Sequence, residues 1–395
     1  MFRLPTVVSL LLLALPKLAV SSPCVTFDAN FNLLVFGLDG KDWNAGTQDS
    51  WTSGITLNAY PSPFHHIEEI SVSPFDGANT TCYLSQFFNA VYVMNGDASK
   101  PSDVHIYDAA AKSWSTQSVD TGSFDPSSFN AILDHDTNVF YAVSKNELFF
   151  LDMGGLKSAN SSALSWTDVG KTPYDASYQP VMALAQNHIH FLNVPNTPEG
   201  DANIFVIHFS YFQPEPQAYP LPDGSKIPAT HGQTASFFQS EGVQQEFAFI
   251  PDDGSKTYVI NVETNTTQAL AGPSTKDPKA TYAASITALI QLDSTGAVSF
   301  LPYKQGDAST NAQAAWTKVA NVAAAAPPGA SSGASPSGSG SGSTPAKTGT
   351  SSASGANPSS TGASQTTNDA LSLTTRGVGL ITMLAGVVGL VASLL

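Results

Sequence analysis

The chain has 395 residues, of which 31 are acidic and 16 are basic, so its formal net charge is −15. This acidity argues against a nucleic-acid-binding protein, which needs Lys and Arg to neutralise phosphate, and against direct electrostatic adhesion to anionic membranes. The length suits one large β domain or two smaller domains, together with terminal segments.

The first residues have the layout of a secretory signal peptide. Arg3 gives a basic start, an apolar run covers Val7–Leu15, and small residues follow up to Ser21. These three regions in this order predict a signal peptide over residues 1–21. The alternative is a buried N-terminal strand or helix.

The central part of the chain alternates short β-rich runs with Gly, Pro, Asn and Asp breaks and shows no sustained helical period. The clearest set lies between Ser128 and Gly170. Its four runs predict antiparallel strands at Phe129–Leu133, Val139–Val143, Glu147–Asp152 and Ser165–Val169. Four such strands in succession make one blade of a β-propeller.

Similar units precede and follow this one. The opening unit predicts strands at Val25–Asp28, Asn32–Leu38 and Ile55–Asn58, and the closing unit predicts strands at Ser285–Leu292, Ala297–Tyr303 and Ala315–Val319. The third runs end near Asn58, Asp108, Asp152, Ser210, Glu263 and Tyr303. A repeat of about 50 residues is typical of propellers such as the kelch type. Six ends predict six blades, with seven blades and a pair of β-sandwiches as alternatives.

One stretch carries the features of a known repeat. A strand ends at Asn95-Gly96, the next strand ends at Tyr107-Asp108, and Trp114 follows. This stretch resembles a kelch repeat, in which a strand ends in two glycines, a later strand ends in Tyr-Asp, and a tryptophan follows at a fixed distance. The resemblance implies an all-β, kelch-like propeller over residues 22–326. Large Tyr and Trp rings suit packing between neighbouring blades, with their polar tips free for partners.

Several residues point to an oxidising compartment. Cys24 and Cys82 are the two cysteines of the chain, and such a pair in a secreted protein predicts a disulfide. The two residues fall near the first strands of consecutive units, which a propeller places side by side. N-glycosylation is predicted at three sequons in polar, turn-like stretches, at Asn79, Asn160 and Asn265.

Metal chemistry finds little support in the sequence. Kelch-type propellers include secreted copper-radical oxidases, which need a cysteine bonded to a tyrosine, and here both cysteines are assigned to the disulfide. His65-His66 is a candidate ligand pair, but neighbours on a strand point to opposite faces. His188 and His190 would share a face and could form half of a metal site, but no third ligand is evident. We therefore assign no metal, cofactor or catalytic residue.

Other charged clusters fit turns. Asp134-His135-Asp136 and Asp252-Asp253-Gly254 lie between expected strands, where Asp and Gly favour turn conformations. The chain contains no nucleophile elbow, zinc-protease motif or phosphate-binding loop. A glycosidase could still use carboxylates from different blades, so a glycoside-active or oxidase-type enzyme stays open as an alternative.

The C-terminal segments indicate attachment to a surface. Residues 327–367 are rich in Ser, Gly, Thr and Pro, which predicts a disordered, O-glycosylated stalk or a bare linker. Residues 368–395 end in the uncharged run Gly377–Leu395, which predicts a GPI-anchor signal. Asn368 is the expected attachment residue and Gly362 its alternative. A retained single-pass helix is the other interpretation.

The leading functional hypothesis is a binding module that recognises a glycan or an extracellular protein through loops on one propeller face. It is expected on the outer face of the plasma membrane or in the cell wall, where the lipid anchor is its contact with the membrane. Chains with this terminal layout resemble fungal surface proteins. A structural cell-wall protein without a discrete ligand is a further alternative.

Overall fold

The computed structural model describes residues 22–52, 68–320 and 322. The chain divides into two units, Met1–Ser332 and Gly333–Leu395, and every described residue belongs to the first. The predicted signal peptide, stalk and anchor signal lie outside the described residues, and so do the expected strand at Ile55–Asn58 and the pair His65-His66. Among the described residues, no helix has the length and apolar character needed to cross a membrane.

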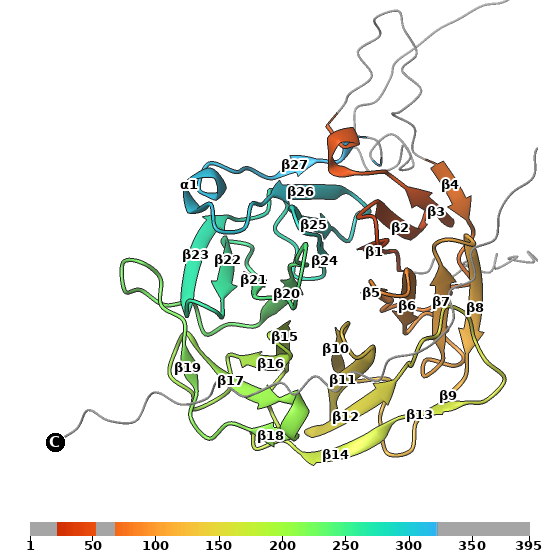
Figure 1. The fold of residues 1–395 in the computed structure, drawn as a ribbon, viewed down its shortest axis with the longest axis horizontal. Coiled ribbons are helices and arrows are strands. Elements are labelled where there is room, and N and C mark those ends of the chain that lie inside the picture. Colours follow the sequence, from red (N-terminus) through yellow and green to blue (C-terminus); the bar gives the residue numbers. More distant parts are fainter. Residues whose placement is uncertain (1–21, 53–67, 321, 323–395) are drawn as a thin grey trace, which may run out of the picture. The chain divides into compact units, whose positions relative to one another are not determined.

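Six β-sheets surround one axis, as the sequence predicts (Figure 1). Blades 1 to 3 contain β1 (Cys24–Phe27), β2 (Leu33–Leu38), β3 (Lys41–Asn44) and β4 (Glu68–Ser71); β5 (Thr81–Ser85), β6 (Ala90–Met94), β7 (Val104–Asp108) and β8 (Ser113–Gln117); and β10 (Asn130–Asp134), β11 (Val139–Ser144), β12 (Glu147–Asp152) and β14 (Thr167–Lys171). Blades 4 to 6 contain β15 (Val181–Ala185), β16 (His188–Leu192), β17 (Asp201–Val206), β18 (Tyr211–Phe212) and β19 (Gln217–Ala218); β20 (Gly232–Ser236), β21 (Glu246–Pro251), β22 (Lys256–Asn261) and β23 (Thr266–Ala271); and β24 (Thr281–Ala284), β25 (Ala288–Leu292), β26 (Val298–Pro302) and β27 (Thr317–Lys318).

Smaller elements lie between and beside the blades. They are β9 (Val119–Asp120), β13 (Leu164–Ser165), the 3-10 turns η1 (Gln48–Ser50) and η2 (Ile207–Phe209), and the helix α1 (Ala308–Asn311). β9 and β13 form a parallel pair beside blades 2 and 3. The first three strands of each blade follow one another in the chain and pair in antiparallel fashion. Each blade is therefore a meander that runs outward from the axis.

Tight hairpins define the inner part of the blades. Asn89, Asn138 and Asn187 occupy the turns between the first and second strands of blades 2, 3 and 4, with φ values of 50°, 58° and 56°. Asparagine tolerates this left-handed backbone region better than most residues, because its short side chain can bond locally. These turn residues therefore fix where each inner hairpin reverses.

The stretch that resembles a kelch repeat packs between two blades. Tyr107 on β7 lies opposite Trp114 on β8, with ring centroids 4.9 Å apart, and Tyr107 also meets Phe36 of blade 1 at 5.0 Å. The Trp114 indole Nε1 donates to Asp42 Oδ2 of blade 1 at 3.0 Å. At Gly96, a Cβ would lie 2.5 Å from the His105 ring, so the close approach of that ring requires glycine.

Blade 1 and blade 6 meet where the ring closes, and in the described chain neither contributes a strand to the other. Contacts between the two blades therefore hold them together. Trp51, 1% exposed, packs edge-on against Phe300 of blade 6 at 5.1 Å. Its carbonyl accepts a hydrogen bond from Ala320 N at 2.9 Å. Trp51 therefore joins the two ends of the propeller through both its ring and its backbone.

The structure differs from the predicted strand positions in three blades. The third strand of blade 1 is Lys41–Asn44, whereas the predicted Ile55–Asn58 lies outside the described residues. Blade 6 begins with an inner strand at Thr281–Ala284, before the predicted first strand Ser285–Leu292. In blade 4, the third strand ends at Val206 rather than near Ser210. There η2 and Ser210, with a φ of 48°, turn the chain back on itself.

Candidate functional site

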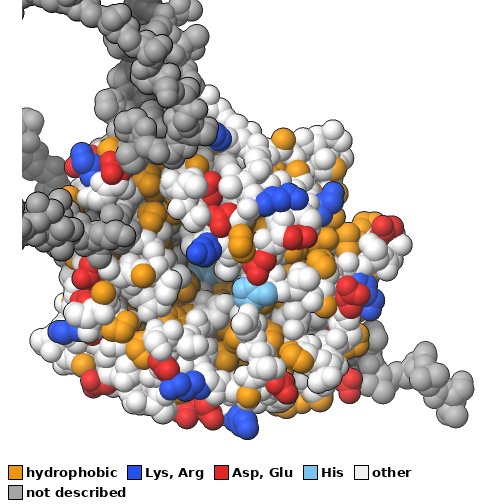
Figure 2. All heavy atoms as spheres, turned by 180° about the vertical axis from the view of Figure 1, so that it is seen from behind, with side chains coloured by type: hydrophobic (Ala, Val, Ile, Leu, Met, Phe, Trp, Pro, Cys, Tyr) orange, Lys and Arg blue, Asp and Glu red, His pale blue; other side chains and the backbone are white. Residues whose placement is uncertain are grey.

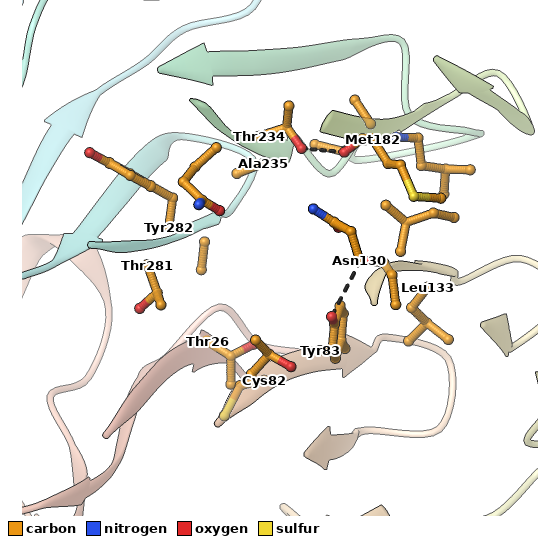
Figure 3. A pocket seen from close by; sticks show the side chains of 18 of the residues that line it. Thr26, Cys82, Tyr83, Asn130, Leu133, Met182, Thr234, Ala235, Thr281 and Tyr282 are labelled. Atoms are coloured by element: carbon orange, nitrogen blue, oxygen red, sulfur yellow. Dashed lines mark hydrogen bonds between the residues drawn. The ribbon is translucent and has the colours of Figure 1, made fainter. Parts of the chain in front are cut away.

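The first strands of the six blades enclose a central pocket of about 470 Å³ (Figure 3). The pocket is lined by residues of β1, β5, β10, β15, β20 and β24. These strands run in the same direction relative to the axis, because each is the innermost strand of an equivalent blade. One end of the pocket is therefore formed by strand beginnings and the other by strand ends.

Aromatic rings close the end formed by strand ends. Phe238, which follows β20 of blade 5, lies 5.7 Å from Phe31 of blade 1 and 5.2 Å from His135 of blade 3, measured between ring centroids. These three blades are not neighbours, so their rings meet across the axis. Phe238 and His135 also line the pocket, and we call this group the floor.

The opposite end is the mouth of the pocket. It is lined by residues that precede or begin the first strands, including Asn79, Ser127, Ser128 and Asn130. The connections between blades and the turns between second and third strands lie on this side, because the strands of a meander alternate in direction. Asn79 and both serines are exposed.

None of the residues that line the pocket in the described part of the chain is Asp, Glu, Lys or Arg. The walls combine amides and hydroxyls with apolar groups. The labelled side chains in Figure 3 show this mixture, with Asn130, Thr26, Thr234 and Thr281 beside Leu133 and Met182. The pocket is thus polar but uncharged around neutral pH, provided that His135 is neutral.

His135 is held neutral by its surroundings. Its side chain is 4% exposed, and this burial lowers the pKa of the imidazole below its usual value, although neighbouring carboxylates oppose the shift. The ring stacks on Phe87, which is 66% exposed, with centroids 5.8 Å apart. The sequence analysis assigned Asp134-His135-Asp136 to a turn, and the structure adds that His135 contributes to the pocket floor.

Hydrogen bonds to the backbone hold several wall residues in place. Asn130 Nδ2 donates to the Pro180 carbonyl at 2.8 Å, and the Thr234 hydroxyl donates to the Met182 carbonyl. Tyr83 Oη donates to the Ala131 carbonyl at 3.3 Å. Each bond crosses between adjacent blades, so the walls are positioned by the packing of the propeller itself.

Two tyrosines give the walls aromatic surface. Tyr83 and Tyr282 are half-buried, and burial raises the pKa of both phenols, that of Tyr282 to about 12. Both therefore remain neutral hydrogen-bonding groups throughout the physiological pH range. The Tyr83 ring packs edge-on against Phe140 at 5.0 Å and the Tyr282 ring against Trp316 at 6.4 Å, so only part of each side chain borders the pocket.

The disulfide expected from the sequence is present and lies in the pocket wall. Cys24 on β1 is bonded to Cys82 on β5, with their Cα atoms 5.8 Å apart. It ties the first strands of blades 1 and 2 together, as their predicted positions near the axis required. Both residues line the pocket.

The histidine pair on β16 is part of the blade packing. His190 is 2% exposed and packs against Tyr219 and Phe247, and desolvation lowers the pKa of its imidazole to about 3. Its ring centroid lies 6.5 Å from that of His188. Over the described ranges, no group of three His, Cys, Asp or Glu side chains is arranged to hold a metal ion.

The three sequons lie in different parts of the propeller. Asn265 is exposed in the turn between β22 and β23, on the floor side. Asn160 is exposed in the long connection between β12 and β13, where its N–H donates to Gln117 Oε1 at 2.9 Å, at the end of the outermost strand β8 of blade 2. Asn79 is exposed at the mouth.

One outer face of the molecule shows acidic, basic and apolar side chains interspersed rather than gathered by sign (Figure 2). The negative net charge therefore does not form a single patch on that face.

Comparisons with known proteins do not assign the chain to a family. No protein-family model matches the chain. No curated protein matches it by sequence. Among solved structures, the chain is similar to YjhT, with 10% identity over 76% of this chain and 98% of the other and a TM-score of 0.48. It is also similar to PorZ, described as a surface component of the type-IX secretion system of Porphyromonas gingivalis, with 12% identity and a TM-score of 0.38. That match covers 76% of this chain and 33% of PorZ.

Proposed function

We propose that the chain is a kelch-like, surface-anchored binding module that takes an uncharged part of a glycan into its central pocket. The observation that carries this proposal is the absence of any charged wall residue among the described residues of a pocket with many amides and hydroxyls. A volume of about 470 Å³ lies within the usual range for small-molecule sites. A short neutral sugar segment suits that space.

The chemistry of the walls favours a sugar over other neutral ligands. Sugars present hydroxyl groups around a ring whose C–H faces are apolar. Asn130 and Gln233 supply amides, and the half-buried side chains of Tyr83 and Tyr282 add apolar surface beside them. A neutral pocket would also exclude carboxylated sugars, because a buried carboxylate without a partner is costly.

The same walls weigh against glycoside hydrolysis in this pocket. Glycosidases of the usual kind place two carboxylic acids about 5–10 Å apart around the scissile bond. The described lining offers no Asp or Glu for either role. Binding without turnover is therefore the function that the pocket supports best, and a protein ligand carrying a neutral side chain or glycan is the second candidate.

The proposed location rests on the chain ends together with the disulfide. A bonded cysteine pair fits the oxidising secretory route that the N-terminal segment predicts. Treatment of intact cells with a phosphatidylinositol-specific phospholipase is expected to release the protein without Gly377–Leu395. If the protein resists release and mass spectrometry still finds those residues, it is a single-pass membrane protein instead.

Glycan binding is testable with a pocket-filling variant. The purified secreted protein is expected to bind a subset of neutral glycans on an array, and Gln233→Trp is expected to weaken that binding at least about tenfold, or about 1.4 kcal/mol. Gln233 lies half-buried in the pocket wall, so an indole there takes up ligand space. The control is Gln305→Trp, at an exposed glutamine between β26 and β27 on the floor side. If Gln233→Trp binds the glycans as tightly as Gln305→Trp and the wild-type protein, the ligand binds outside the pocket.

A further inference from the structure

The sequon at the pocket mouth differs from the other two in what a glycan there would cover. We infer that an N-linked glycan on Asn79 covers the mouth of the central pocket and limits access to slender ligands. Asn79 is exposed and is itself one of the residues that line the pocket. This inference rests on the secretory part of the proposed function, but it does not depend on the ligand.

The backbone around Asn79 is fixed, so the glycan would start from a defined point. Asp76 N and Gly77 N both donate to the Gly96 carbonyl, at 2.9 and 3.0 Å. A Cβ at Gly77 would lie 1.9 Å from the Asn95 carbonyl oxygen, which shows how closely this segment lies on blade 2. Ser22 N donates to the Gly77 carbonyl at 3.0 Å, so the start of the described chain also holds the segment.

The residues that follow Asn79 strengthen this anchoring. Thr80 is 2% exposed, and β5 begins at Thr81. Cys82 is then bonded to Cys24 in the pocket wall. Asn79 therefore stands immediately before a strand that cannot move away from the axis, and the first sugars attached to it would stay at the mouth.

The other two sequons provide internal controls. Asn160 lies between β12 and β13, and its Oδ1 accepts a hydrogen bond from Ser162 N at 2.9 Å. Asn265 occupies the turn between β22 and β23 with a φ of 52°. Asn265 is on the floor side, which Phe238 and its neighbours close. Asn160 is next to Gln117 on β8, the outermost strand of blade 2, and it does not line the pocket. A glycan at either position would leave the mouth uncovered.

Access can be measured without knowing the ligand. Both native cysteines are bonded, so Gln233→Cys supplies a single free thiol in the pocket wall. Its reaction rate is compared for N-ethylmaleimide and for a maleimide carrying a long polyethylene glycol chain, using protein whose Asn79 occupancy is established by mass spectrometry. The glycan is expected to slow the reaction with the large reagent by a factor at least about ten times greater than its effect on the small reagent. This factor corresponds to a difference of about 1.4 kcal/mol in activation free energy.

Removal of the sequon should restore access for the large reagent. Asn79→Gln is expected to do so, and Asn160→Gln is not. Thr81→Val removes the same sequon without changing Asn79, whereas Thr81→Ser retains both the sequon and the hydroxyl group. Asn79 found unoccupied, or equal rates with and without its glycan, would overturn the inference. Neither result would bear on whether the pocket binds a glycan.

Discussion

Replacing Trp51 with alanine is expected to lower the free energy of unfolding by about 3–5 kcal/mol, the usual cost of removing a fully buried aromatic side chain. Trp51 packs against Phe27 of blade 1 and Phe300 of blade 6, and its Nε1 donates to the Gly46 carbonyl at 2.9 Å. No strand is shared between these blades in the described chain, so side-chain packing at this junction, to which Trp51 contributes, helps to hold the ring closed. Urea denaturation measures the loss.

A variant at a second tryptophan serves as a control that distinguishes loss of ring closure from general loss of core packing. Trp166 of blade 3 is 8% exposed and stacks on Phe124 at 4.1 Å, away from the junction between the chain ends. Trp166→Ala should also destabilise the protein, but hydrogen exchange should then increase first in blade 3. Trp51→Ala should increase exchange first in β1 and β24. A Trp51→Ala protein as stable as the wild type would show that closure depends on other contacts.

Removal of the disulfide is expected to cost about 4 kcal/mol in the chain-entropy model, because the bond closes a long loop in the unfolded chain. The two cysteines are separated by 58 positions in the sequence. The double variant Cys24→Ala, Cys82→Ala should therefore unfold at a lower urea concentration than the oxidised wild type. Calorimetry or urea titration at fixed pH gives the difference.

Reduction of the wild type provides the matched control. Dithiothreitol should destabilise the wild-type protein and leave the double variant unchanged, because the variant has no disulfide to reduce. Equal stability of the oxidised protein and the double variant would mean that the constraint on the unfolded chain is offset by strain in the folded state. The closeness of β1 and β5 would then be due to packing alone.

Strand positions were predicted most accurately in the blades whose sequence clearly alternates apolar runs with turn residues. The first three strands of blade 3 were predicted to within one residue at each end, because apolar runs such as Val139–Val143 alternate with turns rich in Asp and Asn. The predicted fourth strand Ser165–Val169 is shifted by two residues from β14. Lys41–Asn44 and Thr281–Ala284 were missed because KDWN and TYAA carry no such pattern. These segments become strands through pairing with β2 and β25, which is a tertiary effect that local sequence does not encode.

The pocket could not be assembled from the sequence because its walls come from six segments far apart in the chain. One signal was nevertheless present. The expected first strand Phe129–Leu133 contains no charged residue, and first strands face the axis of a propeller. The floor was missed for another reason: Phe31, His135 and Phe238 lie in turns, and their meeting depends on the closure of the whole ring.

The most direct test of the account is the affinity of the secreted protein for two glycans that differ only in their terminal sugar, a neutral hexose in one and the corresponding uronic acid in the other. The uncharged walls predict that the neutral glycan binds at least about tenfold more tightly, because a carboxylate would be buried there without a cation. Gln233→Trp should weaken the neutral interaction. Equal or tighter binding of the uronic acid, or binding unaffected by Gln233→Trp, would contradict the assignment of the central pocket as a site for neutral glycans.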